Sequence, residues 1–228
     1  MKIVCVADAY VTCRMMEDGV TPYLKDEDSL SVLFFGESNR INMRDTVKAI
    51  ESMKYEQLDV PDELYDEITN CDVLIVHLCP ITRLLIKKAK NLKAILSCRG
   101  GVENIDVAAA TESGIMVTTN PAHNANAVAE YTIGLILCET RNIARADRAL
   151  RDGIWREMYP NTRVSIRELK NLTVGIVGFG SVGRLVAEKL SVFNCNILIC
   201  DPYLNESAYD FINFKLLICQ HFCKNRIL

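Results

Sequence analysis

The fold is decided by the stretch Thr173–Ala187, which reads TVGIVGFGSVGRLVA. Its first five residues, Thr173–Val177, predict a β-strand that runs directly into the pattern Gly-x-Gly-x-x-Gly, formed by Gly178, Gly180 and Gly183, and then into a helix. In this context the first glycine permits a tight turn, the second lets a phosphate approach the backbone, and the third lets the helix pack against the strand. The stretch therefore predicts a dinucleotide-binding turn, with the pyrophosphate at the helix N-terminus.

An acidic residue completes this motif. Asp201 follows the next predicted strand, Ile197–Cys200, and lies 23 positions after Gly178. A carboxylate in this place accepts hydrogen bonds from the ribose hydroxyls and repels a 2′-phosphate, so it favours NAD over NADP. The alternative is a glycine-rich turn that an acid follows by chance.

Composition and charge narrow the class of protein. The chain has 228 residues, of which 50% are hydrophobic and 24% charged, which is typical of one large or two small globular domains. A formal net charge of −3 gives no general attraction to nucleic acid or to anionic membranes. No apolar run approaches the roughly 18 residues of a membrane span, and Met1–Val6 enters a predicted strand without a leader. We expect a soluble, cytoplasmic protein.

The ten cysteines are scattered rather than paired in motifs. Many lie singly inside apolar runs, as do Cys5, Cys98, Cys138 and Cys200. They are interpreted as reduced core residues. Cys219, His221 and Cys223 could hold a metal, but a structural zinc site has four ligands and no further ligand lies nearby, so no metal is expected.

Short apolar runs alternate with amphipathic ones, which indicates βα units and mainly parallel sheets. The predicted strands are Lys2–Val6, Ser31–Phe35, Val73–Leu78, Ala94–Cys98, Met116–Thr118, Thr173–Val177 and Ile197–Cys200. The predicted helices are Arg44–Met53, Pro61–Thr69, Thr82–Lys90, Val107–Glu112, Asn124–Ala149 and Val182–Phe193. The helix Asn124–Ala149 would span close to ~40 Å, enough to cross from one lobe to another, so it predicts a domain junction.

A second site-like segment is Ser97–Asp106, which reads SCRGGVENID and follows a predicted strand. Consecutive glycines at the carboxyl end of a strand expose N–H groups for an anion, and Arg99 could clamp a carboxylate or a phosphate. The alternative is a glycine turn in which Asn104 or Asp106 caps the next helix. The spacing alone leaves both interpretations open.

Taken together, these motifs resemble the D-isomer-specific 2-hydroxyacid dehydrogenases, the family that includes D-3-phosphoglycerate dehydrogenase. The resemblance runs from about Leu92 to Tyr203. The matching segments, in family order and spacing, are Arg99–Asp106, Ala108–Ile115, Ala129–Leu135, Gly153–Trp155, the glycine turn and Asp201–Tyr203.

The resemblance implies an α/β fold with parallel sheets, in which a long helix links two lobes. A flavodoxin-like substrate lobe would cover residues 1–98, an incomplete Rossmann NAD-binding lobe residues 99–215, and an atypical tail residues 216–228. It also implies a homodimer built on the cofactor lobe and the long helix. The residues implied to touch the carboxylate of the substrate are Arg99, Gly100, Gly101 and Asn104. Those implied to bind NAD are Gly178, Gly180, Ser181, Val182, Gly183 and Asp201.

The implied activity is NAD-dependent hydride transfer at C2 of a small 2-hydroxy or 2-oxo acid. The family's catalytic Arg, Glu and His follow the ribose-binding acid, whereas 27 residues follow Asp201 here and each further βα unit needs about 30. We therefore expect a chain that is truncated or frameshifted after about residue 215, without catalytic residues and catalytically incompetent. The alternative is a non-catalytic NAD-binding module that pairs with a full-length relative, or an inert pseudogene product. His77 is interpreted as a structural residue and His123 as a turn or cap residue.

Overall fold

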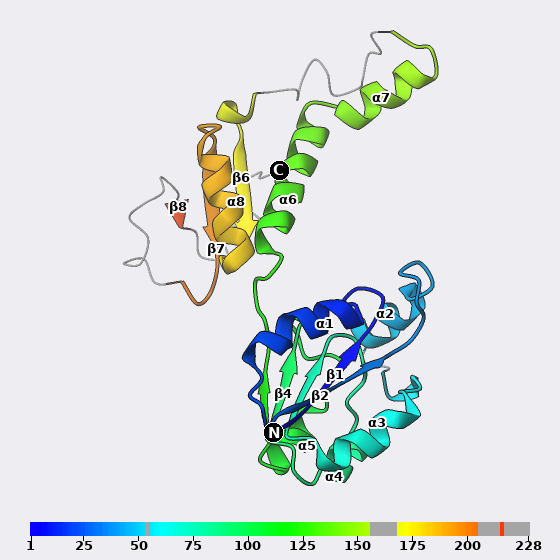
Figure 1. Ribbon diagram of the computed structural model, residues 1–228. Helices are drawn as coiled ribbons and strands as arrows, with labels where there is room; N and C mark the ends of the chain where they lie inside the picture. The colour runs from blue at the N-terminus through cyan, green and yellow to red at the C-terminus, as the bar shows by residue number, and fades with distance from the viewer. Residues whose placement is uncertain (53–54, 156–167, 205–214, 217–228) are drawn as a thin grey trace. The chain divides into compact units, whose positions relative to one another are not determined.

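The computed structural model describes residues 1–52, 55–155, 168–204 and 215–216 (Figure 1). Contacts divide the chain into two units, Met1–Pro121 and Ala122–Leu228. The predicted boundary at residue 98 is therefore too early. Strand β5 (Met116–Thr118) pairs with β4 (Ala94–Ser97), so the segment after residue 98 completes the first sheet.

The first unit is built on a parallel sheet of five strands in the order β2-β1-β3-β4-β5. This is the flavodoxin-like strand order, and it confirms the predicted fold of the first lobe. The strands not yet located are β1 (Lys2–Ala7), β2 (Ser29–Phe34) and β3 (Val73–Val76). Residues from Ile3 to Ala7 in β1 are all buried, because helices cover both faces of this central strand.

Helices cover the two faces of this sheet (Figure 1). The α-helices are α1 (Cys13–Val20), α2 (Arg44–Glu51), α3 (Asp62–Glu67), α4 (Arg83–Lys88) and α5 (Val107–Glu112). Short 3-10 helices lie at Thr21–Tyr23, Tyr55–Gln57 and Ile68–Asn70. Met16 of α1 packs with Ile3, Cys5 and Ala7 of β1. The helices α2 to α5 contribute to the opposite core, which includes Val4 and Val6.

Helix α1 was not predicted. Its apolar face is short: Cys13, Met16 and Val20 recur at helical spacing, but only Met16 is fully buried and the helix has only eight residues. The local signal is its cap, because the Thr12 side chain accepts a hydrogen bond from the Met15 N–H at 3.3 Å.

The second unit contains the parallel strands β6 (Thr173–Val177), β7 (Asn196–Cys200) and β8 (Lys215–Leu216), in that order. Helix α8 (Ser181–Ser191) connects β6 to β7, and a 3-10 helix at Leu169–Asn171 precedes β6. Its core joins Ile176 of β6, Leu190 of α8 and Ile199 of β7 to Ala129 of helix α6 (Ala125–Thr140).

The predicted long helix is broken. Helix α6 ends at Thr140 and helix α7 (Ile143–Arg151) begins three residues later. Between them Asn142 has a φ of 55°, in the left-handed region. Asparagine tolerates this conformation better than most residues. A residue in the left-handed conformation interrupts a right-handed helix, so α6 and α7 are separate helices. Both helices lie within the second unit, so no single helix links the two units.

The cysteines that were interpreted as reduced core residues are not all free thiols. Cys5, Cys98 and Cys138 are free thiols as predicted, whereas Cys200 is disulfide-bonded. Residues Cys219, His221 and Cys223, and the tail after Leu216, lie outside the described residues. In the described part of the chain, no helix has the length and apolar character to cross a membrane. Nor do the described side chains include a group of three or more potential metal ligands.

Candidate functional site

The glycine turn of the second unit has the geometry that a dinucleotide needs. Gly178 follows β6 with a φ of +88°, which a side chain would strain. A Cβ on Gly180 would meet no atom within 4 Å, so the backbone there is open to a ligand. A Cβ on Gly183, by contrast, would overlap the carbonyl oxygen of Gly178. The backbone at these three glycines is thus compatible with the three predicted tasks, and dinucleotide binding by them stays a prediction.

Helix α8 places its first turn at the same site. Gly180 is its N-cap and Ser181 is its first residue. The first four N–H groups of a helix lack partners within the helix, and the helix dipole adds positive character there. Together, these groups can hold the negative charge of a pyrophosphate.

A cavity of about 600 Å³ lies along this turn, within the second unit. Its lining includes Gly178, Gly180, Ser181, Val182 and Gly183, which are five of the six predicted cofactor residues. The lining also includes Asn124, the N-cap residue of helix α6, and Thr132 and Ile136 within that helix. His123 precedes this segment, directly before the N-cap residue Asn124, which agrees with a position in a turn.

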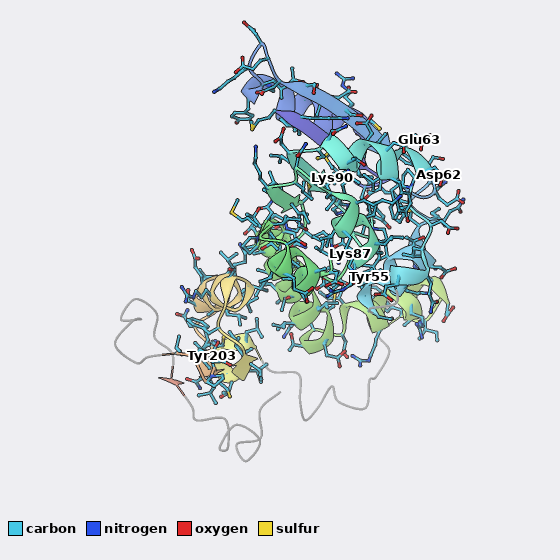
Figure 2. All side chains as sticks on the ribbon, turned by 90° about the horizontal axis from the view of Figure 1, so that it is seen from below. Tyr55, Asp62, Glu63, Lys87, Lys90 and Tyr203 are labelled. Atoms are coloured by element: carbon cyan, nitrogen blue, oxygen red, sulfur yellow. The ribbon has the colours of Figure 1, made fainter. Side chains whose placement is uncertain are left out.

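Asp201, the sixth predicted residue, is held at the end of β7. Its Oδ2 accepts a hydrogen bond from the Phe179 N–H at 2.6 Å, and its Oδ1 accepts one from the Tyr203 N–H at 2.8 Å. These hydrogen bonds lower the pKa of the carboxyl below its ordinary value. A carboxylate has about four lone-pair sites, so two remain for the two ribose hydroxyls. Tyr203 itself projects into solvent (Figure 2), with 94% of its surface exposed.

The first unit contains the second predicted site, the loop after β4. Gly100 has room around it, because the atom nearest to an added Cβ, the Cα of Pro121, would be 3.7 Å away. The carboxylate of Glu103 lies against Gly101, and its Oε2 is 3.5 Å from Nη2 of Arg99. Arg99 is therefore already paired with an acid within the loop. An incoming carboxylate would compete with Glu103 for this guanidinium.

Asn104 has a different role from the direct substrate contact that was predicted. Its side chain is completely buried, and its Nδ2 donates hydrogen bonds to the carbonyls of His77 at 3.3 Å and Cys79 at 2.8 Å. It therefore ties the loop after β4 to the loop after β3. Asp106 caps α5 by accepting a hydrogen bond from the Ala109 N–H at 2.8 Å, which confirms the capping interpretation for that residue.

Replacing Asn104 with alanine is expected to lower the free energy of unfolding by about 2 kcal/mol, because two buried carbonyls lose their donor. Asn126→Ala is the matched control, since that exposed amide bonds only the Glu130 side chain, and a change within about 0.5 kcal/mol is expected. Urea titrations followed by circular dichroism measure both. Equal losses in the two variants would contradict the role given to Asn104.

Sequence reasoning missed a third group of polar residues. Asp8 and His77 directly follow β1 and β3, and they contact each other although 69 positions separate them in the chain. The available signal was that each is the first strongly polar residue after an apolar strand. His77 was interpreted as structural because it stands alone in an apolar run.

An α/β unit with a glycine turn of this geometry and an acid at the end of the next strand is typical of dinucleotide-binding proteins. A family model described as D-isomer specific 2-hydroxyacid dehydrogenase, catalytic domain, matches residues 32–214. The chain therefore belongs to this family of oxidoreductases, whose members act on CH–OH groups.

Individual relatives agree with this assignment. The chain is 38% identical over 157 residues to D-3-phosphoglycerate dehydrogenase of Methanocaldococcus jannaschii, covering 68% of this chain and 29% of that protein. It is also 38% identical over 157 residues to hydroxypyruvate reductase of Thermotoga maritima, covering 66% of this chain and 50% of that protein. The chain thus spans half or less of the length of these two relatives.

A solved structure shows the same fold. The NAD-dependent formate dehydrogenase of Staphylococcus aureus, in complex with NAD, matches with a TM-score of 0.62 and 25% identity. The match covers 97% of this chain and 61% of that one.

Proposed function

We propose that this chain provides the NAD-binding turn and the substrate-carboxylate loop of an NAD-dependent D-2-hydroxyacid dehydrogenase. Hydride would pass between C2 of a small 2-hydroxy acid and the nicotinamide. The observation that carries the proposal is the glycine turn, where Gly180 is open and Gly183 packs against Gly178. The Staphylococcus aureus relative, which was solved with NAD, supports it.

The choice of NAD over NADP rests on Asp201. Its carboxylate is fixed by two backbone N–H groups at the end of β7, next to the turn. Two remaining lone pairs suit the two ribose hydroxyls, whereas a 2′-phosphate would meet a negative charge. The lowered pKa of this carboxyl keeps that charge in place at neutral pH.

On the substrate side, we propose that backbone N–H groups of Gly100 and Gly101 and the guanidinium of Arg99 bind the carboxylate of the 2-hydroxy or 2-oxo acid. Backbone amides and a guanidinium are strong donors to a carboxylate. Asn104 contributes by holding the loop in place through its hydrogen bonds to the carbonyls of His77 and Cys79.

This chain, assayed by itself, is expected to bind NADH without reducing 2-oxo acids. The described residues that follow Asp201, 202–204 and 215–216, include no His, Arg or Glu, and Glu206, His221 and Arg226 lie outside the described residues. We propose that none of these three acts as the acid/base or carboxylate-binding group of the hydride transfer. NADH fluorescence titration with a parallel absorbance assay over a panel of 2-oxo acids tests both halves. Turnover would refute the incompetence, and an absence of NADH binding would refute the proposed function.

We further propose that two copies of the chain associate through the outer face of helix α6. Val128, Tyr131 and Leu135 recur at helical spacing on this face, and each is exposed. They lie away from Ala129, Ile133 and Ile136, the α6 residues that pack into the core of the second unit. An apolar stripe of this kind on a helix is typical of an interface.

The association predicts a specific effect of substitution. Tyr131→Asp places a charge in the proposed interface and is expected to convert dimer to monomer in light-scattering measurements. Tyr23→Asp is the control, because Tyr23 is also an exposed tyrosine but lies in the first unit. A wild-type chain that is monomeric at all concentrations would contradict the proposal.

A further inference from the structure

The first sheet reverses its strand order between β1 and β3, which lie side by side at its centre. In open parallel α/β sheets, ligands bind outside the carboxyl ends of the strands at such a reversal, because the connections leave in opposite directions there. β1 ends at Ala7 and β3 ends at Val76. Asp8 and His77, the next residues of each strand, are therefore placed at this point.

Asp8 is a fully buried and fully bonded carboxylate. Its Oδ1 accepts hydrogen bonds from the N–H groups of Tyr10 at 2.8 Å and Val11 at 3.1 Å. Its Oδ2 accepts one from the Leu78 N–H at 3.1 Å and lies 2.8 Å from Nδ1 of His77. Burial raises the pKa of this carboxyl, but the hydrogen bonds and the imidazole outweigh burial and lower it. Asp8 is thus a fixed negative charge at neutral pH.

His77 is oriented by this charge. A carboxylate at Nδ1 holds a proton on that nitrogen, so Nε2 is the nitrogen that exchanges protons with its surroundings. The side chain retains 18% exposure, so the ring is only partly covered.

The backbone of His77 lies next to the proposed substrate loop. Val76 pairs with Ser97 in the sheet, and the Cys98 N–H donates to the Val76 carbonyl at 2.8 Å. Asn104 then bonds the carbonyl of His77 itself. The loop after β3 and the loop after β4 are therefore fixed to one another at the carboxyl edge of the sheet.

The other groups around the pair are neutral or positive. The Tyr10 ring centroid is 6.1 Å from that of His77, and the Arg40 guanidinium lies 5.4 Å from the Tyr10 centroid. Burial and the charge of Asp8 raise the pKa of the thiols of Cys79 and Cys98, so both stay uncharged. On the loop after β4, the charged side chains of Arg99 and Glu103 pair with each other.

We propose that His77, held by Asp8, is a substrate-contacting residue of the first unit that binds a small 2-oxo acid anion through its protonated Nε2. The ligand class rests on the proposed function. In the imidazolium form Nδ1 donates to Asp8 and Nε2 donates to a ligand oxygen. In the neutral form Nε2 presents a lone pair, which repels an anion, so binding takes up one proton from solvent.

Because the proposed contact needs the imidazolium form of His77, anion affinity is expected to be highest at acidic pH and to fall as pH rises. Asp8 and the thiols of Cys79 and Cys98 do not cause this pH dependence. The lowered pKa keeps the carboxyl of Asp8 ionised, and the raised pKa keeps both thiols protonated.

The test uses the full chain and oxamate, an unreactive analogue of a 2-oxo acid, with and without NADH. Calorimetry in two buffers of different ionisation enthalpy reports proton uptake, and NMR reports the ring nitrogens of His77. We expect close to one proton taken up per oxamate at pH 8 and less at pH 6, a shift of the Nε2 resonance, and an affinity about tenfold higher at pH 6 than at pH 8.

Two variants distinguish a direct contact between His77 and the ligand from a purely structural role of His77. His77→Gln keeps a hydrogen-bond donor but cannot gain a proton, so its oxamate affinity should be about tenfold lower at pH 6 and independent of pH. Asp8→Asn should also lose the proton uptake. The wild-type NMR measurement requires no variant, so it decides the question even if Asp8→Asn does not fold.

The oxamate experiments test this inference independently of the proposed NAD-binding function. The inference is overturned if millimolar oxamate does not bind the wild-type chain, if it binds without proton uptake, or if His77→Gln binds it with the wild-type pH profile. NADH titration of the same samples reports the second unit separately. Oxamate binding with proton uptake but without NADH binding would support the pair and refute the NAD-binding function.

Discussion

Gly183→Ala is expected to destabilise the second unit and to weaken NADH binding at least about tenfold. The added Cβ would overlap the carbonyl oxygen of Gly178, which is backbone and cannot rotate away. Overpacking of this kind typically costs about 1–3 kcal/mol, and about 1.4 kcal/mol corresponds to a tenfold change in affinity. Thermal melts and NADH fluorescence titrations measure the two effects.

Two other glycines serve as controls for this prediction. Gly180→Ala meets no atom within 4 Å, so stability should change by no more than about 0.5 kcal/mol, while the methyl group obstructs the pyrophosphate and weakens NADH binding. Gly134→Ala lies in the middle of α6 with no neighbour within 4 Å. It should raise stability by up to about 1 kcal/mol and leave NADH binding unchanged. If Gly183→Ala behaved like Gly134→Ala, the packing role of Gly183 would be wrong.

Asp201→Asn is expected to reduce NADH affinity about tenfold and to bring NADPH affinity close to it. The substitution removes the charge that strengthens hydrogen bonds to the ribose hydroxyls and that repels a 2′-phosphate. Titrations with both cofactors give the ratio of affinities directly.

Glu188→Gln is the matched control for charge. Glu188 is an exposed acid on α8, so its replacement alters the net charge of the same unit without touching the turn. The NADH to NADPH ratio should stay at the wild-type value. A ratio that is unchanged in Asp201→Asn would contradict the assignment of Asp201 to the ribose.

The elements of this fold could be predicted wherever the signal lay within a few adjacent residues. Strands Thr173–Val177 and Met116–Thr118 and helix Val107–Glu112 were predicted with their observed bounds. Helix α1 was not predicted, because its apolar face is short, with Met16 buried and Cys13 and Val20 half-buried beside it in a helix of only eight residues. The break at Asn142 was also missed, since the apolar pattern continues across it and the change is one of backbone conformation.

The glycine turn, the acid that follows β7 and the alternation of strands and helices could be predicted from the sequence, because each depends on neighbours close in the chain. The strand order, the division after Pro121 and the burial of Asn104 became known from the three-dimensional structure alone. It also joined Asp8 to His77 across 69 positions. These features depend on contacts between distant segments, which form when apolar faces are buried together and which no local pattern records.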